Sequence, residues 1–138
     1  MDIDLRHPIG PADPEAAAVL LARRPARWLR PFLVLATGPA CASRSPWFRL
    51  GPFADDRAEL VWRPRCPEAA FERFVGHLDL ERPAGPGDPT PELAVRGTTE
   101  GDEHQVGVIV VERLLAMLAP ALASATTRGG RARGQESG

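Results

Sequence analysis

VGVIVVERLLAMLAPAL, at Val106–Leu122, decides the fold, because it is the longest apolar run in the chain. Drawn as a helix with about 100° per residue, it gathers five side chains on one stripe: Val111, Leu114, Leu115, Leu118 and Leu122. Pro120 falls on the opposite side and should bend the last turn, since proline has no N–H to donate to the preceding turn. We therefore expect a helix from about Gln105 to Ala123 whose apolar stripe packs against another layer.

Alternating segments upstream of this helix predict the layer it packs against. In the stretch FERFVGHLDLE at Phe71–Glu81, apolar Phe74, Leu78 and Leu80 alternate with residues that include His77, which is typical of a half-buried strand. Six segments are predicted as strands: 1–9, 32–37, 47–50, 58–63, 74–81 and 92–98. The later strands follow one another at hairpin distances, with a turn at Asp55-Asp56-Arg57, so they should form an antiparallel meander.

A helix start signal separates the first strand from the others. Asp13 can cap a helix, Pro14 fits its first position and Glu15 its first turn, so we expect a helix over Pro14–Arg23. A second short turn is expected at Ala26–Leu29. The predicted fold is α+β in the order strand, helix or helix pair, five or six strands, long helix. One domain is expected over residues 1–123, containing a proline-glycine loop at 83–91, followed by a disordered tail over residues 124–138.

Composition narrows the function classes. The chain has 138 residues, 43% of them hydrophobic and 25% charged, with a formal net charge of −1, so no basic field is present to attract nucleic acid. The start, MDIDLRHPIG, lacks the apolar core of a signal peptide. The run Val106–Leu122 contains Glu112 and Arg113 and is too short to span a membrane comfortably. We therefore expect a cytoplasmic protein. Its arginine-only basic residues are typical of a GC-rich, for example actinobacterial, genome.

The two cysteines, Cys41 and Cys66, are expected to be reduced thiols in a cytoplasmic protein, although one disulfide is an alternative. They lack CxxC spacing and predict no metal site. The acidic turn before the last helix, Gly101–Glu103, is expected to be solvated and to lie near the helix N-terminus rather than to bind a cation.

Four motifs give the chain a resemblance to a known superfamily. They are AELVWRPR at 58–65, FERFVGHLDLERPAG at 71–85, PELAVRGTTE at 91–100 and the glycine-led helix at 106–122. In this pattern and order the chain resembles the START-like or SRPBCC superfamily, over roughly residues 1–125. The resemblance implies the helix-grip fold, a curved antiparallel sheet wrapped around a long C-terminal helix. In that superfamily the groove between sheet and helix binds apolar small molecules.

The implied groove sets the candidate ligand-binding residues. They are Trp47, Trp62, Phe74, Leu78, Val95, Arg96, Val111, Glu112, Leu115 and Leu118. Most would be apolar walls, whereas Arg96 and Glu112 are expected to pair at the groove mouth, because a half-buried acid needs a partner.

No residue is assigned a catalytic role, and no cofactor is expected. His77 should face solvent by strand alternation, and no motif ties a serine or cysteine to a histidine. The leading prediction is binding of a hydrophobic or amphipathic small molecule in the groove. The alternatives are an enzyme similar to polyketide cyclases or aromatases, which needs a positioned acid or base, and an accessory interaction domain whose groove is filled by its own side chains.

Overall fold

The computed structural model describes residues 1–10, 13–24, 26–41, 45–82 and 90–137, with the side chains of the last helix described as far as Thr126. Its elements are β1 (Asp2–Pro8), α1 (Pro14–Arg23), the 3₁₀ helix η1 (Ala26–Leu29), α2 (Arg30–Thr37), the 3₁₀ helix η2 (Pro39–Cys41), β2 (Trp47–Leu50), β3 (Arg57–Arg63), β4 (Arg73–Glu81), β5 (Glu92–Glu100) and α3 (Gly107–Ser137). The chain is therefore α+β with a long C-terminal helix, as the sequence predicts.

Five strands form one antiparallel sheet in the order β1-β5-β4-β3-β2. The run β2 to β5 confirms the predicted meander, and β1 pairs with β5 so that Ile3 lies opposite Gly97. Asp55 and Asp56 form the turn before β3 with φ angles of 54° and 60°. Positive φ at both central residues matches the twist of a tight hairpin.

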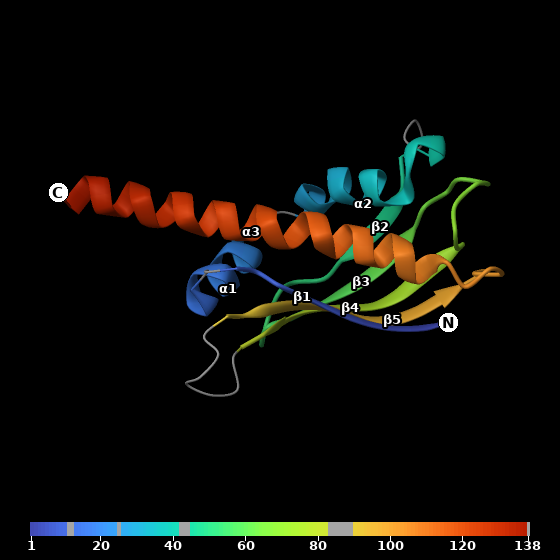
Figure 1. The fold of residues 1–138 in the computed structure, drawn as a ribbon, viewed down its shortest axis with the longest axis horizontal. Helices are drawn as coiled ribbons and strands as arrows, with labels where there is room; N and C mark the ends of the chain where they lie inside the picture. Colours follow the sequence, from blue (N-terminus) through green and yellow to red (C-terminus); the bar gives the residue numbers. More distant parts are fainter. Residues whose placement is uncertain (11–12, 25, 42–44, 83–89, 138) are drawn as a thin grey trace.

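The helices cover one face of this sheet (Figure 1). α3 packs against β1 and β5 and is flanked by α1 and α2. The predicted apolar stripe is confirmed, since its five members are at most 1% exposed: Val111, Leu114, Leu115, Leu118 and Leu122. The result is a two-layer, helix-grip-like arrangement in which the other sheet face carries mostly polar side chains.

By length and composition alone, α3 could also be a membrane-spanning helix. The segment Gly107–Thr126 is long and apolar enough to cross a membrane, although the run Val106–Leu122 by itself is predicted to be too short. The assignment of α3 as a core helix rests on packing, because its leucines are buried against the sheet.

The segment predicted as a strand over Phe32–Thr37 is instead most of α2, so this prediction was wrong. Leu29, Leu33 and Ala36 are spaced by four and three residues and are all buried, which fits a helix face. Leu35 is 61% exposed, a position that a fully buried strand would not leave open. A short apolar run is ambiguous between strand and helix when its pattern alone is considered, and here it packs as a helix against α3.

The backbone of α3 continues to Ser137, which corrects the helix boundary predicted at Ala123 and extends helical backbone into the predicted tail. Among the described side chains of α3, the fully buried leucines still end at Leu122. Most of the predicted proline-glycine loop, residues 83–89, lies outside the described residues.

Asp102 anchors the start of α3. Its two carboxylate oxygens accept hydrogen bonds from the backbone N–H groups of Val106 (2.9 Å) and Gly107 (3.0 Å) and from the Thr99 hydroxyl (3.0 Å). These N–H groups have no partner inside the helix, and a carboxylate is favoured at this end of the helix dipole. The acidic turn at 101–103 thus caps the helix.

Cys41 and Cys66 form a disulfide, so the preferred prediction of two reduced thiols was wrong. The bond joins η2 to the segment that links β3 to β4. The two cysteines are 25 residues apart in sequence, and the sequence pattern does not predict the distance between them in the fold.

Candidate functional site

Seven apolar groove candidates meet between the sheet and α3, but they fill that space instead of lining an opening. Each is at most 2% exposed: Trp62, Phe74, Leu78, Val95, Val111, Leu115 and Leu118. Side chains packed in this way form the hydrophobic core of the domain. The centre of the predicted groove is therefore closed.

The other three candidates lie outside that core. Trp47 is 44% exposed and its ring contacts the guanidinium of Arg63 at 5.6 Å. Glu112 is exposed on α3. Arg96 bonds to acids of β1 and β4 on the open face of the sheet, so the structure does not bring Arg96 and Glu112 together. The expected pairing was wrong, because Val95 faces α3 and its neighbour in a strand must face away.

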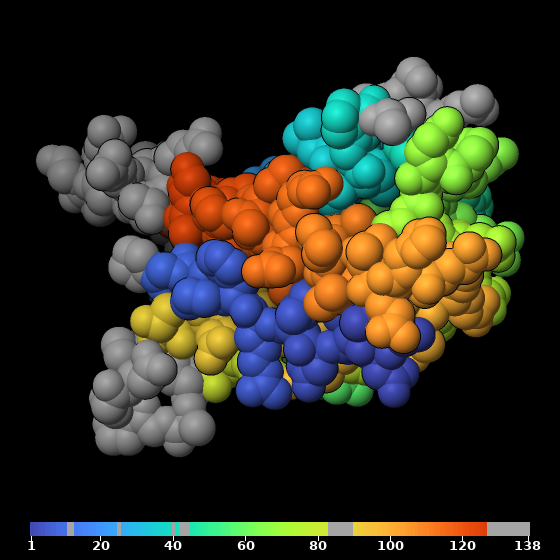
Figure 2. Space-filling model, turned by 45° about the vertical axis from the view of Figure 1, so that its right-hand side comes forward, coloured from blue at the N-terminus to red at the C-terminus, as the bar shows by residue number. Residues whose placement is uncertain are grey.

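An opening exists at one end of the helix layer, beside the first turns of α3. This α3 cleft has a volume of about 1010 Å³ and lies between the end of α2 and the β3–β4 connection. Figure 2 shows the first turns of α3, in orange, beside the light-green connection. Its apolar floor comes from Phe71, Val106, Ile109 and Val110. Ile109 is 50% exposed, so this floor reaches solvent.

Charged side chains surround this apolar floor. Arginines and glutamates line the cleft in equal number, together with His104 at the turn before α3. The guanidinium of Arg113 donates a 2.9 Å hydrogen bond from Nη1 to the backbone oxygen of Ala36, although the side chain as a whole is exposed. An arginine beside an apolar surface can orient an anionic or polar group of a ligand.

Trp62 adds a buried polar atom next to the cleft. Its ring meets that of Phe71 edge-on, with centroids 5.2 Å apart. Its indole nitrogen is buried and has no hydrogen-bond partner among the described residues. Buried polar atoms normally have a partner, so this N–H is one of the few unsatisfied groups in the described core.

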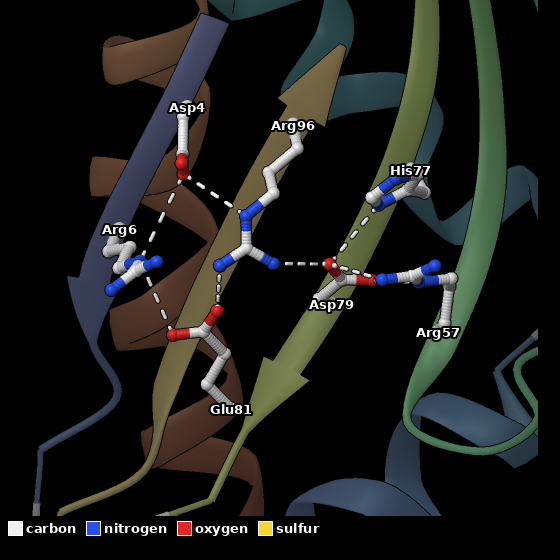
Figure 3. Close-up of polar contacts among 7 residues, drawn as sticks. All are labelled: Asp4, Arg6, Arg57, His77, Asp79, Glu81 and Arg96. Atoms are coloured by element: carbon white, nitrogen blue, oxygen red, sulfur yellow. Dashed lines mark hydrogen bonds and ion pairs between the residues drawn. The ribbon is translucent and has the colours of Figure 1, made fainter.

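A second group of functional residue types lies on the open face of the sheet (Figure 3). Asp79 is 4% exposed. It accepts hydrogen bonds from Arg57 Nε at 2.8 Å and Arg96 Nη1 at 2.7 Å, and His77 Nδ1 lies 3.1 Å away. The cluster continues through Glu81, which bonds to Arg96. Neighbouring strands bring these residues together in register, and sequence reasoning missed Asp79 because a solvent-facing position predicted exposure.

This sheet-face cluster balances its own charge. Three carboxylates meet three arginines: Asp4, Asp79 and Glu81 with Arg6, Arg57 and Arg96. The hydrogen bond to Glu81 raises the pKa of Arg96 above its usual value. Asp79 therefore shares its negative charge among Arg57, Arg96 and His77. The cluster is best explained as the stabilising cover of a sheet face that no described helix covers.

The other shifted pKa values belong to surface ion pairs. The Arg73 guanidinium lowers the pKa of Glu100, and hydrogen bonds to Asp56 and Glu15 raise the pKa of Arg82.

Comparison with known proteins supports the fold but assigns no function. No family model matches the chain, and no curated protein matches it. The crystal structure of TTHA0849 from Thermus thermophilus matches with a TM-score of 0.54 and 19% identity, over 91% of this chain and 99% of that one. At this identity the likeness shows a shared fold. The START-like or SRPBCC assignment stays a prediction.

Proposed function

We propose that the protein binds an amphipathic small molecule in the α3 cleft. The observation that carries this proposal is an opening of about 1010 Å³ with an apolar floor and a charged rim, beside the buried side chains that fill the centre of the predicted groove. Ligand sites are concave, commonly several hundred Å³ in volume, and combine apolar walls with placed polar groups. The α3 cleft has a larger share of charged side chains than such sites usually have, which favours an amphipathic ligand over a purely apolar one. The proposed site lies beside the first turns of α3, between the end of α2 and the β3–β4 connection, and not in the groove between sheet and helix that the resemblance implies.

The cleft also suggests how a ligand would lie. The apolar part would contact Ile109, which is 50% exposed, and the half-buried Val106 just before α3. A carboxylate or other polar head would meet Arg113, which donates to the backbone oxygen of Ala36. We do not assign catalysis to this site, because general acid–base chemistry needs a positioned proton donor or acceptor.

The proposal is tested with anilinonaphthalene sulfonate, an apolar dye that carries one anionic group. Ile109→Glu places a charge on the cleft floor, and Val75→Glu is the matched control, since Val75 is 40% exposed on the open sheet face. We expect saturable one-site binding by the wild type, binding at least about tenfold weaker in Ile109→Glu, and unchanged binding in Val75→Glu. Near-ultraviolet circular dichroism confirms that each variant is folded.

A second function, an accessory interaction domain, is favoured by the closed centre of the predicted groove. The same titration distinguishes the two functions. A folded wild type that does not bind the dye, or equal binding by both variants, would refute the cleft as a ligand site and leave the interaction domain as the better explanation.

A further inference from the structure

We propose that the reduced forms of Cys41 and Cys66, together with Glu68, bind a thiophilic divalent cation such as Zn²⁺. The two sulfurs and a carboxylate oxygen of Glu68 all lie within 4.8 Å of one another. The Cα atoms of the cysteines are 5.7 Å apart, so both side chains already point to one place. The inference is independent of the dye-binding function proposed above.

The local backbone holds two of these ligands on one short turn. The Ala69 N–H donates to the Cys66 carbonyl at 3.0 Å, which closes the turn that contains Glu68. A carboxylate oxygen of Glu68 lies 3.1 Å from the sulfur of Cys66. Cys41 arrives from η2 and is 2% exposed, so its position is fixed by packing. The carboxylate therefore reaches the sulfurs without a rearrangement of the turn.

The chemistry of this donor set selects the ion. Two thiolates and one carboxylate provide soft and hard donors of the kinds that bind Zn²⁺, whereas Mg²⁺ and Ca²⁺ prefer oxygen alone. Three protein ligands leave one tetrahedral position for water or a ligand atom. Cys66 and Glu68 both line the α3 cleft, so that fourth position would open toward it.

The disulfide and the ion exclude each other, because each sulfur that bonds to its partner is lost as a thiolate donor. A small-molecule disulfide such as oxidised glutathione would convert one state to the other. It accepts two electrons from the two thiolates and leaves as two glutathione thiolates, which take up protons from water, while the protein gains the bond between Cys41 and Cys66 and the ion is released. Metal occupancy of this site would therefore depend on the redox state of the pair.

Cobalt reports directly on such a site, since Co²⁺ bound to thiolate absorbs in the near ultraviolet. The full-length protein is reduced with a phosphine, freed of reductant without oxygen and titrated with Co²⁺, then with Zn²⁺. We expect one equivalent of Co²⁺ with a sulfur charge-transfer band, displacement by Zn²⁺, release by oxidised glutathione, and no such band in the disulfide form.

Two exposed glutamates on the same segment give a matched pair of variants. Glu68→Gln should weaken Co²⁺ binding at least about tenfold, because loss of even an outer partner of a metal ligand costs about that much. Glu72 lines the same cleft but does not belong to the group of Cys41, Cys66 and Glu68. Glu72→Gln should therefore bind Co²⁺ as the wild type does. Neither variant alters a buried side chain, so both should fold. The proposal is overturned if the reduced, folded protein gives no sulfur band, or if both variants bind equally.

Discussion

Gly76 and Gly97 face each other across β4 and β5, and the ring of Phe74 lies over both of them. The tip of that ring is 2.8 Å from the position a Cβ would take on Gly76 and 2.7 Å from that on Gly97. Backbone atoms are closer still, since Arg96 O is 2.0 Å from the first of these positions. The absence of two side chains therefore leaves room for the tip of a large aromatic ring on the core face of the sheet.

Gly97→Ala is expected to destabilise the protein by about 2 kcal/mol or more, because neither strand backbone can move aside cheaply. The added methyl would meet Val75 O at 2.4 Å. Urea unfolding monitored by circular dichroism measures the change. Gly51→Ala is the control, since its nearest contacts would be at an ordinary 3.6 Å. Equal stability of the two variants would show that the sheet adapts to the methyl group.

Asp79 is expected to matter more for stability than the exposed acids of the sheet-face cluster. Asp79→Ala leaves Arg57 and Arg96 without their buried acceptor, which should cost about 1–2 kcal/mol, less than a fully buried pair because both arginines reach solvent. Asp4→Ala, where the side chain is 58% exposed, should cost less than about 1 kcal/mol. Chemical denaturation measures both, and an equal loss in the two variants would contradict the ranking.

Periodicity predicted those parts of the fold that have one buried face. The stripe of α3, the alternation in β4 and the capped start of α1 at Asp13 all follow from the sequence and are present in the structure. Each has a local cause, a repeat of 3.6 or 2 residues or a cap, so local sequence carries the signal. The segment Phe32–Thr37 is too short for its apolar pattern to distinguish a strand from a helix, and in the structure it is part of a helix that packs against α3.

The candidate sites depended on contacts that local sequence does not encode. Periodicity selected the residues of the core as groove walls, because a buried position and a ligand wall share the same apolar pattern. The α3 cleft arises where α2 ends and the β3–β4 connection turns away, which is a property of the packed layers. The burial of Asp79 among arginines depends on the register of the strands on either side of it. The short distance between Cys41 and Cys66 depends on the path of the loops that carry them.

The Arg73–Glu100 pair should stabilise the protein in a pH-dependent way. The hydrogen bond from Arg73 lowers the pKa of Glu100 in the folded state. A lowered carboxyl pKa contributes stability above the unfolded value, about 4.3, and that stability is lost as pH falls through the folded pKa. A double-mutant cycle with Arg73→Gln and Glu100→Gln should therefore give a coupling that is present at neutral pH and disappears in acid. Added salt should reduce it, because both side chains are exposed. A coupling that persists in strong acid would contradict this assignment.

Pro120 lies inside α3 on its exposed side, where it cannot donate a hydrogen bond to the carbonyl of Ala116. Pro120→Ala restores that donor and replaces the poorest helix former with the best, a gain of about 3 kcal/mol in an unconstrained helix. Greater freedom of the unfolded chain offsets about 1 kcal/mol of this gain. We expect a net stabilisation of about 1–2 kcal/mol in thermal and urea unfolding, whereas Ala116→Gly, on the same exposed side, should destabilise by about 1 kcal/mol. If Pro120→Ala instead lowers stability, the conformation that Pro120 imposes on α3 is needed to seat Leu118 and Leu122 on the sheet, and the proline is a structural requirement of the two-layer fold.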